Sequence, residues 1–125
     1  MVENDSLVFV VDDDPSIRQT LTWLIESVGI RVETFSSADA FLKRERHYGP
    51  ACLILDVRMP GMTGLELQKK LKISGFELPV IFISAHNGLR IRQEALEGGA
   101  VAFLQKPFDD QALLDAIHSA IDAMS

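Results

Sequence analysis

Disulfide chemistry is nearly excluded, because the 125-residue sequence contains a single cysteine. Cys52 lies within a short apolar run and has no second cysteine in the chain with which to pair. A free cysteine in such a run usually packs as a small hydrophobic side chain. The cysteine content is therefore consistent with the reducing environment of the cytoplasm.

The sequence has fewer basic than acidic residues. Lys and Arg number 12 against 18 Asp and Glu, and the formal net charge is −6 at pH 7. Proteins that bind nucleic acid through its phosphates need a basic surface that displaces counterions. We therefore expect this chain not to bind nucleic acid directly.

Long apolar runs are missing as well. No apolar stretch approaches the roughly 18 residues of a membrane-spanning helix. Residues 1–6 have neither the cationic start nor the apolar core of a signal peptide. We expect a cytoplasmic protein without membrane contact.

At 125 residues, 47% of them hydrophobic, the chain has the size of one compact domain and leaves no room for a second.

The sequence does contain a series of short apolar runs that predict strands. Most of the runs lack in/out alternation, as expected for strands covered by helices on both faces of a parallel sheet. The second run alternates with polar residues, which favours an edge strand. The predicted strands are Leu7–Val11, Ile30–Phe35, Cys52–Leu55, Val80–Ile83 and Val101–Leu104.

Amphipathic stretches between the runs predict helices. Asp14 can cap a helix with Pro15 in its first turn, and Gly29 ends it. Further helices are expected over Ala38–His47, from near Gly64, over Leu89–Glu97 and from about Asp109. Apolar residues at helical spacing are expected to face the sheet, and they include Ile17, Leu21, Leu24, Ile25, Val28, Leu67, Leu71, Leu113, Ile117, Ala120 and Ile121.

Five strand–helix units with right-handed crossovers predict a doubly wound, three-layer α/β domain. We expect residues 1–125 to form one domain with a core of about 7–122. In such domains, functional side chains gather at the C-terminal ends of the strands.

Polar residues follow four of the predicted strands. Asp12 and Asp13 come after the first strand and Asp56 ends the third. Ser84 ends the fourth, and Lys106 follows the fifth. Clustered carboxylates repel one another unless a cation joins them, and such oxygen ligands favour Mg²⁺, with Mn²⁺ as a substitute. A carboxylate beside a cation, a lysine and a hydroxyl is arranged to attack phosphorus.

Each of these residues has a simpler explanation when taken singly. Adjacent aspartates at a strand end more often cap a helix or face solvent than bind a metal. Chance, however, would scatter five such residues among loops and helix faces. The joint pattern favours a functional site.

The polar residues lie in four segments that agree with one family in order, spacing and flanking apolar runs: VVDDDPSIR (10–18), LILDVRMPGMTG (53–64), VIFISAH (80–86) and FLQKPF (103–108). With these segments, residues 7–122 resemble the receiver domain of two-component response regulators. The resemblance implies a flavodoxin-like (βα)5 sheet of order 2-1-3-4-5. Regulators with a helix-turn-helix output domain are the most similar in character.

The resemblance also implies roles for individual residues. Asp56 would be the phosphoacceptor and would bind Mg²⁺ directly, as would Asp13, while Asp12 would act mainly through a metal-bound water. The backbone carbonyl of Arg58 would complete the protein ligands. The remaining implied site residues are Ser84 and Lys106, which would contact phosphoryl oxygens, and Phe103, the aromatic residue that would change rotamer.

Two departures from the usual family pattern are mild. Ser84 replaces the commoner threonine, which removes a methyl group that stiffens χ1. Phe103 lacks the hydroxyl of tyrosine-bearing members. The Lys106–Pro107 bond is expected to be cis.

The implied partners are a sensor histidine kinase, an output DNA-binding domain beyond Ser125 and a second copy of the chain. Phosphorylation is expected to alter the surface of the fourth helix, fifth strand and fifth helix, roughly Leu89–Ala120. Ser84 would move inward, and an exposed Phe103 would turn in behind it. The protein would not be an enzyme in the usual sense, because it catalyses only its own phosphorylation and dephosphorylation.

Two rival functions stay open at this point. A haloacid-dehalogenase-like phosphatase would use Asp12 of an Asp-x-Asp motif, but it would leave Asp56 without a role, and the chain is short for that fold. An unreactive pseudo-receiver would have no reason to keep a repelling carboxylate cluster.

Three further residues have weaker signals. Trp23 falls opposite the apolar stripe of its helix, where a partner contact and packing over a neighbouring helix are equally favoured. His86 is best explained as a solvated loop residue, although it lies at the expected pocket rim. His47 is expected on a helix surface.

Overall fold

The computed structural model describes residues 6–45, 47, 49–85 and 88–124. Within these ranges, strands and helices alternate along the chain. The strands are β1 (Leu7–Val11), β2 (Arg31–Phe35), β3 (Ala51–Asp56), β4 (Val80–Ser84) and β5 (Ala102–Gln105). The helices are α1 (Pro15–Glu26), α2 (Ala38–Leu42), α3 (Gly64–Ile73), α4 (Leu89–Glu97) and α5 (Asp110–Asp122).

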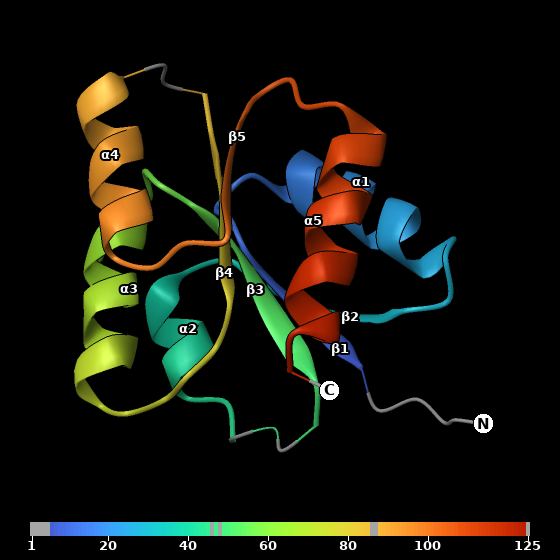
Figure 1. The fold of residues 1–125 in the computed structure, drawn as a ribbon, viewed down its shortest axis with the longest axis horizontal. Coiled ribbons are helices and arrows are strands. Elements are labelled where there is room, and N and C mark those ends of the chain that lie inside the picture. The colour runs from blue at the N-terminus through green and yellow to red at the C-terminus, as the bar shows by residue number, and fades with distance from the viewer. Residues whose placement is uncertain (1–5, 46, 48, 86–87, 125) are drawn as a thin grey trace.

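The strands form one parallel sheet in the order β2-β1-β3-β4-β5. Helices α1 and α5 cover one face of the sheet, and α2, α3 and α4 cover the other (Figure 1). Strand β2 lies at an edge, as its alternating sequence predicts. The structure confirms the doubly wound α/β fold and its strand order.

Burial explains why the central strands lack alternation. Every residue of β1, β3 and β4 is buried, because each face of the sheet packs against helices. Phe9 and Leu53 pack on the side of α2, α3 and α4, whereas Val8 and Ile54 pack on the side of α1 and α5. Successive side chains of a strand point to opposite faces, so each strand contributes to two cores.

Local capping fixes where two of the helices begin beside the sheet edge. The Asp14 side chain accepts a hydrogen bond from the Ser16 N–H at 2.8 Å. Thr63 and Glu66 form a reciprocal capping box at the start of α3. Both caps satisfy backbone N–H groups that have no partner within the helix.

Helix α2 is shorter than predicted, ending at Leu42 rather than at His47. The guanidinium of Arg44 instead binds both carboxylate oxygens of Glu33 on β2, at 2.6 and 2.7 Å. His47 therefore lies beyond the helix, where its ring centroid is 6.3 Å from that of Phe9.

Two apolar residues at the ends of predicted elements, one on the apolar stripe of the first helix and one at the start of the fifth strand, are exposed. Val28 follows the end of α1 in a turn and is 41% exposed, and Val101 precedes β5 and is 45% exposed. Trp23 is exposed on α1, as its position opposite the apolar stripe predicts. Among the described residues, no helix has the length and apolar character needed to cross a membrane.

Candidate phosphoacceptor and metal site

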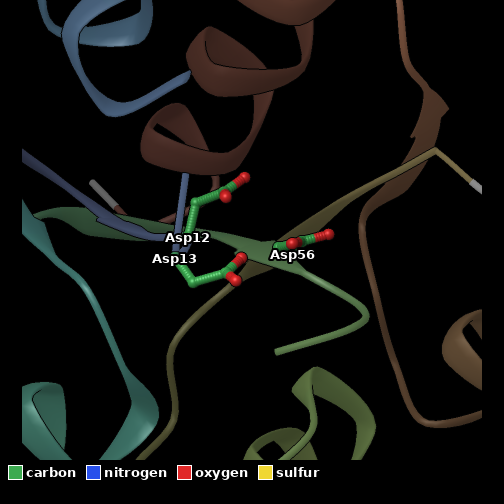
Figure 2. Close-up of side chains that lie close together, drawn as sticks. All are labelled: Asp12, Asp13 and Asp56. Carbon is green, nitrogen blue, oxygen red and sulfur yellow. The ribbon is translucent and has the colours of Figure 1, made fainter. Parts of the chain in front are cut away.

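The predicted polar residues meet at one edge of the sheet because β1 and β3 are parallel neighbours. Val11 pairs with Leu55, so the next residues, Asp12 and Asp56, lie side by side. Figure 2 shows Asp12 and Asp13 at the end of β1 beside Asp56 at the end of β3. One oxygen from each of the three carboxylates lies within 4.8 Å of the others.

Asp12 is completely buried and fixed by several contacts. Its carboxylate accepts hydrogen bonds from the Lys106 ammonium at 3.0 Å and from the Asp14 N–H at 2.9 Å. Its backbone carbonyl accepts one from the Arg18 guanidinium at 2.7 Å. Sequence reasoning did not identify this role of Arg18. Asp12 is therefore held rigidly, whereas its neighbour Asp13 is exposed.

Lys106 connects the two inner carboxylates across the site. Its ammonium nitrogen lies 3.0 Å from Asp12 Oδ2 and 3.7 Å from Asp56 Oδ1. Its backbone N–H donates to the carbonyl oxygen of Ser84 at 2.7 Å, which ties the end of β5 to the end of β4. The Lys106–Pro107 peptide bond is cis, as predicted.

Asp56 has an unusual electrostatic environment. Its pKa is raised from 3.8 to about 6, chiefly because burial removes the carboxylate from water and also because Asp12 repels it. Lys106 and a hydrogen bond from the Arg58 backbone act in the opposite direction without cancelling these effects. The positive charge of Lys106 next to Asp56 therefore does not offset the burial of the carboxylate and the negative charge of Asp12.

The carboxylate cluster fits a divalent cation. Three carboxylates face one ammonium group, so the ionised site has a net negative charge. Mg²⁺ binds through oxygen atoms and usually keeps several waters, which suits a partly open cluster with the exposed Asp13 at its rim. The role of the Arg58 backbone carbonyl as a metal ligand stays a prediction.

A glycine allows the loop after Asp56 to fold back against the site. A Cβ atom on Gly64 would lie 2.3 Å from the Asp56 carbonyl oxygen and 3.1 Å from the Phe82 ring. No other residue fits at that distance, so glycine is needed for α3 to begin here. The PGMTG segment contained this glycine, but only the folded chain reveals the close approach.

Ser84 and Phe103 lie on the adjacent strands β4 and β5. Both are buried, and the ring centroid of Phe103 is 6.3 Å from that of Phe82. The expectation of an exposed Phe103 is wrong for this structure, since its ring fills space between β4 and α4. His86 lies outside the described residues, so its predicted position at the rim is not tested.

Comparisons with known proteins agree with this arrangement. Residues 8–118 match the sequence model of the response regulator receiver domain. The chain is 47% identical over 118 residues to the transcriptional regulatory protein TdiR of Thauera aromatica, covering 94% of this chain and 52% of TdiR. It is 41% identical over 114 residues to the transcriptional regulatory protein FixJ of Azorhizobium caulinodans, covering 91% of this chain and 54% of FixJ.

Solved structures give the same result. The response regulator StyR matches with a TM-score of 0.89 at 46% identity, covering 95% of this chain and 60% of StyR. The structure described as FixJ-N matches with a TM-score of 0.89 at 33% identity, covering 98% of both chains. The chain spans about half the length of relatives such as TdiR and FixJ. Because the family match extends over residues 8–118, the chain belongs to the response regulator receiver domain family.

Proposed function

We propose that this receiver domain accepts a phosphoryl group on Asp56 from a phosphohistidine of a sensor histidine kinase, in a reaction that depends on Mg²⁺. Residues 7–122 would act as one domain in this reaction. The observation that carries the proposal is the position of Asp56, whose buried carboxylate lies beside Asp12, Asp13 and the Lys106 ammonium. Asp12 is a poorer acceptor because it is fully buried and bound to Lys106.

The chemistry follows from this arrangement. An oxygen of the Asp56 carboxylate attacks phosphorus, the bond between phosphorus and the histidine nitrogen breaks, and an aspartyl phosphate forms. Lys106 supplies a positive charge close to the new phosphoryl oxygens, and the Ser84 hydroxyl supplies a donor. Asp13 and Asp56, together with Asp12 and the backbone carbonyl of Arg58, would hold a Mg²⁺ ion, which would supply the remaining charge neutralisation when bound.

Dephosphorylation of Asp56 uses water and needs no separate phosphatase. Attack of water on the phosphorus of the aspartyl phosphate releases inorganic phosphate and restores the carboxylate. The domain would thus promote its own modification and its own return to the resting state. A haloacid-dehalogenase-like phosphatase is not supported, since the chain belongs to the receiver family and Asp12 is inaccessible.

The output of the switch is proposed to be control of transcription. TdiR and FixJ are named as transcriptional regulatory proteins and are about twice as long as the matched region. A helix-turn-helix domain following this receiver would provide the DNA contact that an acidic domain with a net charge of −6 does not. Phosphorylation would change the surface of α4, β5 and α5, and with it the contact to the output domain or to a second copy.

Mass spectrometry after treatment with a small-molecule phosphodonor and Mg²⁺ tests the proposal. We expect one phosphoryl group on Asp56 of the parent and none on Asp56→Asn. Equal labelling of Asp56→Asn would contradict the assignment, and labelling on Asp12 would support the phosphatase instead. Absence of label on a folded parent would indicate an unreactive pseudo-receiver.

A further inference from the structure

Arg92 joins α4 to β5 through two contacts with the same residue. Its guanidinium donates a hydrogen bond to the carbonyl oxygen of Phe103 at 3.2 Å. The guanidinium carbon also lies 5.9 Å from the centroid of the Phe103 ring, within the range of a cation–π interaction. One side chain thus contacts both the backbone and the side chain of Phe103.

The backbone contact matters because β5 is an edge strand. It pairs with β4 on one side, and no strand of the described part of the chain lies on its other side. Edge strands expose backbone groups that need another partner. Arg92 donates a hydrogen bond to the Phe103 carbonyl and so holds the outer side of β5 in place.

The same strand positions the residues of the acidic site. Phe103 pairs in register with Phe82 of β4, and their rings are neighbours. Three residues further along, the Lys106 N–H donates to the Ser84 carbonyl. A displacement of β5 would therefore move the Lys106 ammonium relative to Asp56.

We infer that Arg92 is a positioning residue, which holds Phe103 in its buried rotamer and β5 in the place where Lys106 faces Asp56. This inference rests on the proposed function, because it assigns a role in phosphoryl binding. Arg92 acts through Phe103 and Lys106 and does not itself contact the acidic cluster.

The expected effect is moderate, because each contact is weak at a partly exposed position. Loss of a hydrogen bond and a cation–π contact lowers the fraction of molecules in which Phe103 is buried and Lys106 faces Asp56. The apparent affinity for a phosphoryl group or its mimic falls by the same fraction, by about fivefold.

The experiment compares two arginines on the same helix. Arg90 is exposed, and among the described residues its ion pair is with Glu94 at 3.9 Å. Arg92→Met and Arg90→Met therefore remove the same charge, but only the first removes the contacts with Phe103. Calorimetric titration with beryllofluoride and Mg²⁺ should show about fivefold weaker binding for Arg92→Met. Arg90→Met should match the parent, and Arg92→Lys should restore part of the loss.

A second measurement separates positioning from general stability. Proton NMR contacts between the rings of Phe103 and Phe82 should weaken in Arg92→Met and persist in Arg90→Met. If Arg92→Met binds beryllofluoride as tightly as Arg90→Met does, or keeps the ring contacts unchanged, the inference is wrong. If the folded parent itself fails to bind beryllofluoride, the proposed function fails, and the ring contacts alone then decide whether Arg92 holds Phe103.

Discussion

Within the described part of the chain, Arg44 and Lys106 each form ion pairs with residues distant in sequence, and the two sets of charges differ in how well they are balanced. Arg44 and Glu33 form a bidentate pair of one cation and one anion. Their hydrogen bond lowers the pKa of Glu33 and raises the pKa of Arg44, so both charges are stabilised. Around Lys106, a single ammonium pairs with both Asp12 and Asp56, Asp13 adds a third carboxylate to the cluster, and the pKa of Asp56 is raised.

A balanced ion pair and a cluster of like charges are therefore held in the fold in different ways. The Arg44 pair is satisfied within the folded chain and ties the segment after α2 to β2. The acidic site is held in place by strand register and by the close approach of Gly64, against the repulsion of its own carboxylates. A cation can supply the positive charge that balances these carboxylates, so cation binding should change the stability of the acidic site more than that of the Arg44–Glu33 pair.

The largest expected effect comes from disturbing the backbone that holds the acidic site. Gly64→Ala would place a methyl group 2.3 Å from the Asp56 carbonyl oxygen. We expect a loss of about 2–3 kcal/mol in the free energy of unfolding, measured by urea denaturation. Gly88→Ala is the control, since its Cβ would make ordinary contacts with Ile91 at 3.6 Å or more. Equal stability of the two variants would show that the loop relaxes without cost.

The next effect concerns metal affinity. Asp13→Ala removes an exposed carboxylate from the cluster and should weaken Mg²⁺ binding by at least about tenfold in calorimetry. Lys106→Ala should bind Mg²⁺ as well as the parent or more tightly, because a competing positive charge is gone. Asp122→Ala, at the exposed end of α5, controls for net charge. Similar losses in the Asp13 and Lys106 variants would contradict the proposed metal site.

A smaller effect is expected on the free energy of unfolding when Asp56 is replaced by asparagine, measured in the presence of a chelator. The folded-state pKa of Asp56, about 6, lies above its ordinary 3.8. The contribution of Asp56 to stability is thus fully present below the lower value and is lost as pH rises through the higher one. At pH 7, Asp56→Asn should be more stable than the parent by about 1–2 kcal/mol. This advantage should shrink as pH falls from 7 to 4, and a constant advantage would argue against the raised pKa.

The smallest effect belongs to the balanced pair. Arg44→Met leaves Glu33 unpaired, but both side chains are partly exposed to solvent. We expect a loss of about 0.5–1 kcal/mol in the free energy of unfolding and no change in Mg²⁺ binding. Lys43→Met, at the neighbouring position, should change neither quantity. A change in Mg²⁺ affinity in Arg44→Met would show that the two regions are coupled.

The sequence was sufficient to predict the sheet and the members of the acidic cluster, because apolar runs mark strands and parallel strands end at one edge. It was not sufficient where contacts between distant residues decide the outcome. The end of α2 depends on Arg44 meeting Glu33, which lies 11 positions earlier. The buried ring of Phe103 depends on Phe82 and Arg92, and no local pattern specifies that rotamer.

The charge imbalance next to Asp56 can be measured directly by carbon-13 NMR titration of its carboxyl group. In a chelator, the midpoint should lie near 6, as burial and Asp12 require. With saturating Mg²⁺ the midpoint should fall below the ordinary 3.8, because the cation stabilises the ionised carboxylate. A midpoint near 3.8 in chelator that does not move when Mg²⁺ is added would contradict the account of the site as an anionic cluster completed by a cation.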